Sequence, residues 1–151
     1  MVDIVHRIGI RAPVAEVYRA VATVDGIAGW WSEDTTENGG GDGAFTIRFR
    51  RDGEEIGQME IVPTRRVPDQ QVVWRVDAGP DEWIGTEVTF ELSQQDGYTI
   101  VLFGHRNWRE AVEFTAHCSM KWATFLLSLR ELVEAGRGRP SPEDLKIDNW
   151  N

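Results

Sequence analysis

The sequence predicts an α+β domain in which a curved antiparallel sheet of about six strands wraps around one long helix near the C-terminus. Three patterns support this fold class. Apolar and polar residues alternate through the middle of the chain, Asp-Gly pairs separate the alternating segments, and a long apolar stripe with spacings of three and four residues follows them. The 151 residues suit one domain of ordinary size. Because a sheet with one apolar face must be covered, the long helix is expected to pack on it.

The first third of the chain predicts one strand and two short helical segments. Residues 4–10 carry isoleucines of one parity and form the strand. Pro13 stands at the first position of an amphipathic helix over residues 14–22. Residues 27–31 form one further helical turn. Residues 32–43 are polar and glycine-rich, so we expect a mobile loop there.

The middle of the chain predicts five further strands, joined in antiparallel order. Asp52-Gly53 and Asp96-Gly97 are strong hairpin signals, and Pro63 is expected to end the second of these strands. The last strand is apolar on both parities as far as Phe103, which indicates a central strand covered on both faces. The five strands are expected over residues 45–50, 55–62, 72–77, 84–92 and 98–106.

A helix over residues 110–135 follows the last strand. About 25 residues at 1.5 Å each span roughly 37 Å, enough to cross a whole sheet. Gly136 fits the position just after the end of this helix. We therefore expect one domain over residues 1–137 and a C-terminal extension over residues 138–151. Apolar residues that could dock this extension on the surface are Leu145, Ile147 and Trp150.

Composition excludes several function classes. The 25 acidic residues outnumber the 16 basic ones and give a net charge of −9, opposite in sign to that of a dedicated nucleic-acid binder, so no nucleic-acid partner is expected. No apolar stretch is long enough to span a membrane, and the N-terminal residues lack the pattern of a signal peptide. Cys118 is the only cysteine, so no internal disulfide can form, and a reducing cytoplasmic location is the expectation.

Tryptophan is the residue type that stands out. The chain has seven, and each brings a large apolar surface with one N–H that needs a partner. Such a set in a small acidic domain predicts either a very aromatic core or an apolar cavity. The seven stand at positions 30, 31, 74, 83, 108, 122 and 150.

Several short motifs in this order resemble a known family. They are Ile10-Arg11-Ala12-Pro13 with Val17-Tyr18, the Trp30-Trp31 pair, Gly43-Ala44-Phe45, the strand from Thr99 to His105, and Lys121-Trp122 followed by Leu126, Leu129 and Leu132. Together they resemble the helix-grip fold of the START-related (SRPBCC) superfamily, and within it most closely the family of the C-terminal domain of the heat-shock-protein ATPase activator. Lys121 departs from the pattern, which has glycine there.

The resemblance implies an internal cavity and no fixed catalytic set. Several relatives bind apolar ligands, some cyclise or dehydrate polyketides, and others act by binding partner proteins. Because a fold does not by itself specify a function, the residues must decide among these roles.

If the strand parity holds, an aromatic set faces the space between sheet and helix. Trp31, Trp74 and Phe103 are expected near the open end of that space, whereas Trp122 fits a core position better. Trp83 follows a turn and fits the rim of a cavity or an exposed surface equally well. The candidate ligand-binding residues are Trp31, Phe49, Trp74, Trp83, Phe103, His105 and Trp122.

The polar candidates leave two interpretations open. His105 shares the inward parity of Phe103, so it could orient a ligand or act as a general acid or base, or it could bond a loop carbonyl, which we favour slightly. His117 and Cys118 are adjacent on a helix and point about 100° apart, which argues against a catalytic pair. His117 is then a packing residue and Cys118 a small buried hydrophobe. No metal-ligand spacing and no cofactor motif is present, so neither is predicted.

The sequence therefore leads to one main hypothesis and two alternatives. The main hypothesis is a small-molecule binding domain with a cavity for an apolar or aromatic ligand. The first alternative is an enzyme of the polyketide cyclase or dehydratase type that uses His105. The second is a protein-interaction module linked to stress or chaperone pathways, and a homodimer is compatible with each.

Overall fold

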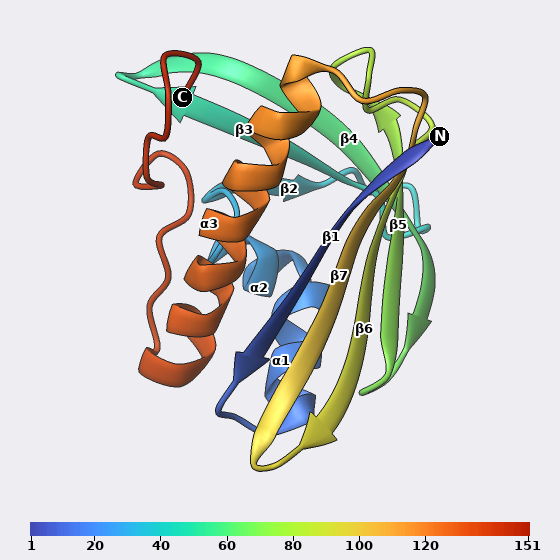
Figure 1. Cartoon of the computed structure of the whole chain (residues 1–151), viewed down its shortest axis with the longest axis vertical. Coiled ribbons are helices and arrows are strands. Elements are labelled where there is room, and N and C mark those ends of the chain that lie inside the picture. The colour runs from blue at the N-terminus through green and yellow to red at the C-terminus, as the bar shows by residue number, and fades with distance from the viewer.

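A computed structural model describes all residues from 1 to 151, and it confirms the predicted α+β fold class (Figure 1). The elements in chain order are β1 (Val2–Ile10), α1 (Val14–Ala22), α2 (Val24–Ala28), β2 (Asp34–Glu37), β3 (Phe45–Arg51), β4 (Glu54–Val67), β5 (Gln71–Ala78), β6 (Glu87–Gln95), β7 (Tyr98–Trp108) and α3 (Glu113–Ala135).

The seven strands form one antiparallel sheet in the order β1-β7-β6-β5-β4-β3-β2. The two Asp-Gly signals are the turns of the β3–β4 and β6–β7 hairpins. Asp52 and Gly53 have φ values of 54° and 82°, and Asp96 and Gly97 have values of 51° and 81°. Positive φ at both central residues matches the right-handed twist of the strands, which explains why these pairs close hairpins.

Helix α3 crosses the concave side of the curved sheet, and α1 and α2 fill the lower part of the same side (Figure 1). Its buried face includes Cys118, Trp122, Phe125, Leu126 and Leu129, at the expected spacings of three and four residues. The helix begins at residue 113, three residues later than predicted, because residue 112 is extended and its N–H donates to the Thr115 hydroxyl at 3.1 Å. It ends where Gly136 adopts a φ of 87°.

Strand β2 corrects the prediction of a loop over residues 32–43 and brings the strand count to seven. The segment is polar and shows no apolar alternation, so the sequence carries no strand signal there. Tertiary contacts hold it instead. Asp34 accepts hydrogen bonds from Arg50, with its Oδ2 at 2.9 Å from Nη2, and β2 pairs with β3 from Asp34–Arg48 to Glu37–Phe45.

Two strand boundaries also differ from the prediction. Strand β4 continues through Pro63 to Val67, because an irregularity in its pairing with β5 between Pro63 and Arg65 accommodates a residue that has no N–H to donate. Strand β6 begins at residue 87 and not at 84. Residues 81–85 form a turn in which the backbone N–H of Trp83 donates to the Pro80 carbonyl at 2.8 Å and Gly85 has a φ of 83°.

The interior is one cluster of 28 buried hydrophobic residues. Six of the seven tryptophans belong to it, and Trp150 is the exception, with 48% of its surface exposed. The residues after α3 fold back along that helix and end beside the β3–β4 hairpin (Figure 1). The chain thus ends close to the β3–β4 hairpin, where Arg51 Nε donates to Asn151 Oδ1 at 2.9 Å.

Candidate functional site

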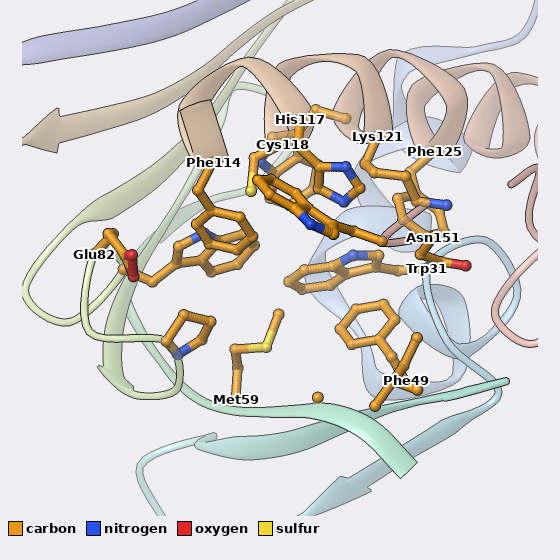
Figure 2. Close-up of a pocket in the computed structure, with 16 residues that line it drawn as sticks. Trp31, Phe49, Met59, Glu82, Phe114, His117, Cys118, Lys121, Phe125 and Asn151 are labelled. Atoms are coloured by element: carbon orange, nitrogen blue, oxygen red, sulfur yellow. The ribbon is translucent and has the colours of Figure 1, made fainter. Parts of the chain in front are cut away.

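A cavity of about 460 Å³ opens between α3, the β3–β4 hairpin, the turn at residues 80–83 and the C-terminal tail (Figure 2). Ten of its 16 lining residues are hydrophobic. Volumes of this order are typical of small-molecule sites in proteins.

The floor of the cavity comes from inward-facing positions of β3 and β4. Phe49 pairs with Gly57, and Met59 follows on the same parity of β4. A side chain built at Gly57 would meet no atom within 4 Å, so the missing side chain leaves this part of the space open. A glycine inside a strand often marks such an approach of a ligand.

The roof of the cavity comes from one stripe of α3. Phe114, Cys118, Lys121 and Phe125 lie at helical spacings of three or four residues and point towards the floor (Figure 2). Trp31 projects between roof and floor from the segment after α2, where its backbone N–H donates to the Ile27 carbonyl at 2.9 Å. The side chains that enclose the space therefore come from elements far apart in sequence.

Stacked tryptophans form the inner wall. The ring centroids of Trp31 and Trp122 are 4.9 Å apart, and those of Trp83 and Trp122 are 5.9 Å apart with an interplanar angle of 17°. Trp31 also stacks on Trp74, at 5.5 Å, but Trp74 lies behind it and does not line the space. Trp31, Trp83 and Trp122 are almost completely buried by these ring contacts and form the packed inner boundary of the cavity.

His105 lies outside the cavity and is fully buried. The Trp122 indole N–H donates to His105 Nδ1 at 3.1 Å, so the proton of the neutral ring is on Nε2, which donates to the Thr86 hydroxyl at 2.8 Å. Thr86 in turn donates to the Trp83 carbonyl at 2.6 Å. Burial lowers the pKa of His105 to about 3, so the ring stays neutral near pH 7. Both nitrogens are occupied, and the ring orders the loop at Trp83 through Thr86.

Lys121 and His117 of the lining are paired within the protein, whereas the Glu82 carboxylate has no ion-pair partner. Lys121 Nζ donates to the Asp144 carboxylate and to the Leu145 carbonyl, the latter at 2.8 Å. His117 Nδ1 donates to Asp148 Oδ2 at 2.6 Å, and this hydrogen bond lowers the pKa of Asp148. Asn151 accepts from Arg51 Nε at 2.9 Å. Lys121, His117 and Asn151 of the lining thus already have hydrogen-bond partners, and each of these contacts involves the tail.

Trp83 is the polar group of the wall that keeps an unused donor. Its indole N–H is buried and has no hydrogen-bond partner. It lies near the Cys118 thiol. Burial raises the pKa of that thiol to about 12, and the nearby indole N–H of Trp83 lowers it by a smaller amount. The geometry nonetheless falls short of a hydrogen bond, and a thiol is a weak acceptor. Cys118 is therefore not a nucleophile at neutral pH.

The structure brings together four of the seven predicted ligand-binding residues. Trp31, Phe49, Trp83 and Trp122 line the cavity. The other three, Trp74, Phe103 and His105, lie in the packed core and do not line it. Strand parity places a side chain on the inner face of a sheet, but the distance between sheet and helix at that point decides whether it meets another side chain or a space.

Sequence reasoning missed several lining residues. Met59 and Phe114 looked like ordinary core residues, and Trp150 like a tail residue that docks on the surface. Gly57 carried the one available signal, as a glycine in the interior of a strand. The tail gave no signal at all, because its approach to the cavity depends on contacts with α3 and β3.

Two further features of the structure limit the range of sites. No group of three or more His, Cys, Asp or Glu side chains is arranged so that it could hold a metal ion. No helix is long and apolar enough to cross a membrane.

Comparison with known proteins gives a family and several structures of the same fold. The family model described as activator of Hsp90 ATPase homolog 1-like protein matches residues 11–134. The solution structure of the Aha1 dimer from Colwellia psychrerythraea is 42% identical, with a TM-score of 0.74, and the match covers 91% of this chain and 100% of that chain. No curated protein matches the sequence.

Two more distant structures show the fold alone. CalU16 from Micromonospora echinospora is 21% identical over 93% of this chain and 78% of its own, with a TM-score of 0.67. DynU16, a protein of the dynemicin biosynthetic locus, is 18% identical over 90% of this chain and 48% of its own, with a TM-score of 0.73.

Proposed function

Because this chain belongs to the activator of Hsp90 ATPase homolog 1-like family and has an apolar cavity between its sheet and its long helix, we propose that it binds an uncharged, largely apolar small molecule there. The observation that carries the proposal is the lining itself. It is mostly aromatic and aliphatic, and its Lys121 and His117 are already paired with Asp144 and Asp148.

The lining favours an aromatic ligand. Phe114 is partly exposed and Trp150 is 48% exposed, so a flat molecule in the cavity could pack against both rings. The net charge of −9 disfavours an anionic ligand.

The geometry argues against the enzyme alternative that relies on His105. A general acid or base must come within hydrogen-bond reach of the group whose proton it moves. His105 does not line the cavity, and both of its ring nitrogens are bonded to Trp122 and Thr86. Cys118 lines the cavity, but its thiol is held protonated, so it does not replace His105 in this role.

We test the proposal by filling the cavity from its floor. A Gly57→Leu substitution places a side chain where no atom lies within 4 Å of the new Cβ, so the protein should fold with unchanged stability. Binding of the uncharged fluorophore N-phenyl-1-naphthylamine, followed by its emission, should weaken at least tenfold relative to the wild type. Gly57→Ala is the matched control and should reduce affinity far less.

Two results would count against the proposal. One is an absence of binding of N-phenyl-1-naphthylamine to the wild type. The other is equal affinity in the wild type and in Gly57→Leu, which would show that the fluorophore binds elsewhere on the molecule.

We also propose that the chain forms a homodimer, since the 42% identical Aha1 from Colwellia psychrerythraea is a dimer in its solution structure. Light scattering coupled to size-exclusion chromatography measures the mass directly. A mass of about twice the 17.1 kDa of the chain supports the proposal, and a monomeric mass at all protein concentrations contradicts it.

A further inference from the structure

The C-terminal tail, residues 140–151, closes one side of the cavity. The family model matches residues 11–134, so this segment lies outside the matched range. Its residues Trp150 and Asn151 nevertheless line the cavity together with residues of α3 and β3. The tail thus forms one wall of the cavity.

A buried ion pair anchors the middle of the tail. The side chain of Asp144 is 2% exposed and accepts a hydrogen bond from Lys121 on α3. Arg51 at the end of β3 lies 3.2 Å from the other carboxylate oxygen, measured from Nη2 to Oδ1. Lys121 Nζ also donates to the Leu145 carbonyl at 2.8 Å, so one side chain of α3 holds two neighbouring tail residues.

A second anchor fixes the residues next to the cavity. Asp148 accepts a hydrogen bond from His117 on α3, and its other oxygen accepts the backbone N–H of Trp150 at 2.8 Å. This arrangement sets the position of the Trp150 ring. The ring centroid lies 5.3 Å from that of His117 and 6.3 Å from that of Phe114.

Trp150 is held in this position although it gains little burial there. It is 48% exposed, yet five anchoring side chains from α3, β3 and the tail itself determine where its backbone lies. A large apolar ring kept half in water beside an apolar cavity gains most of its contact area when a ligand fills the space.

We infer that the tail is part of the ligand site and that Trp150 determines the size of the ligand that the site admits. The inference rests on the proposed function, because it assigns a role to the tail in binding at the same cavity. The expected ligand is an aromatic molecule small enough to fit between Trp150 and the inner tryptophan wall.

The test compares two uncharged fluorophores of different size, N-phenyl-1-naphthylamine and the larger Nile red, on the full chain. Trp150→Ala should weaken binding of the smaller fluorophore by about three- to tenfold through lost contact area. The same substitution should leave Nile red binding unchanged or tighter, because the opening becomes wider. The ratio of the two dissociation constants should therefore change at least threefold in favour of Nile red.

Two further variants separate this effect from a general loss of structure. Leu102→Ala removes an apolar side chain of matched exposure, 47%, from the outer face of β7, and should leave both dissociation constants unchanged. Asp144→Asn weakens the middle anchor and should shift the size preference in the same direction as Trp150→Ala. It should also speed hydrogen exchange of the amides of residues 144–151 and leave that of α3 unchanged.

The outcomes distinguish the two proposals. If the wild type binds neither fluorophore, the proposed function fails and the inference fails with it. If the wild type binds and Gly57→Leu does not, but Trp150→Ala keeps the wild-type ratio, the cavity binds ligands and the role of the tail is wrong. A changed ratio in Trp150→Ala with an unchanged ratio in Leu102→Ala supports the inference.

Discussion

The aromatic interior has a packed end and a hollow end, built from the same residue types. At the packed end Trp74 and Phe90 have ring centroids 4.9 Å apart and both are almost completely buried. At the hollow end Phe49, Trp83 and Phe114 surround a space of about 460 Å³. The contrast shows that aromatic content alone does not separate a core from a binding site.

Buried hydrogen-bonding groups near the hollow end differ in whether they have partners. His105, whose ring packs against Trp83 and Trp122, uses both ring nitrogens, with Trp122 and Thr86 as partners. Two buried indole N–H groups have no partner, those of Trp83 and Trp108, and of these Trp83 lines the cavity. Folding leaves polar atoms unsatisfied rarely, so these two N–H groups are exceptions within the aromatic interior.

The largest expected effect is a difference between the two ends in the stability lost when an aromatic side chain is replaced by alanine. Trp74→Ala at the packed end should lower the free energy of unfolding by about 3–5 kcal/mol, because it leaves a closed void. Phe49→Ala at the hollow end should cost roughly 2 kcal/mol, because the side chain already borders an open space. Urea unfolding followed by far-UV circular dichroism measures both, and equal costs would show that the hollow end is packed in solution.

A second expected effect concerns the pH dependence of stability. The pKa of folded His105 is about 3, below the ordinary value of 6.5, so between these values the unfolded chain binds a proton that the folded protein does not. The free energy of unfolding should therefore fall as the pH is lowered from about 6.5, with a slope that approaches roughly 1.4 kcal/mol per pH unit.

His105→Gln removes the titrating group and keeps a donor and an acceptor for Thr86 and Trp122. In this variant the free energy of unfolding should depend less steeply on pH between 6.5 and 5. The decrease in slope should correspond to the uptake of about one proton, as measured by urea unfolding at a series of pH values. A slope identical to that of the wild type would contradict the buried, neutral state of His105.

The smallest expected effect is a difference in stability between substitutions of Trp122 and Trp83, which stack on each other in the cavity wall. Trp122→Phe removes a bonded N–H and leaves His105 Nδ1 buried without a donor, which should cost about 1–3 kcal/mol beyond the lost ring area. Trp83→Phe removes an N–H that has no partner, so this extra cost should be absent. Thermal and urea unfolding of the two variants give the difference, and a larger loss for Trp83→Phe would assign that N–H a partner in solution.

Much of the fold was predictable because local patterns agree with the tertiary structure. The Asp52-Gly53 and Asp96-Gly97 turns and the stripe of α3 each have a local physical cause in backbone conformation or helical period. Strand β2 was not predictable, because it is held by pairing with β3 and by the contact of Asp34 with Arg50, and it carries no apolar alternation. The continuation of β4 past Pro63 depends likewise on its irregular pairing with β5.

The candidate site was predictable only in part. The tryptophan count and strand parity drew attention to Trp31 and Trp83, which line the cavity, but equally to Trp74 and His105, which do not. Parity specifies the face of a sheet and carries no information about how far the facing helix stands from it. The tail could not be placed, because its anchors join Asp144 and Asp148 to residues of α3 and β3.

By itself the sequence determined the class of fold, the hairpin turns, the long covering helix and an interior rich in tryptophan, since these follow from local conformation and hydrophobic period. The tertiary structure alone decided where that interior is filled and where it is hollow. The reason is physical: packing depends on the separation of surfaces that distant segments set jointly, so His105 became a bonded core residue while Gly57 and Trp150 came to border the cavity.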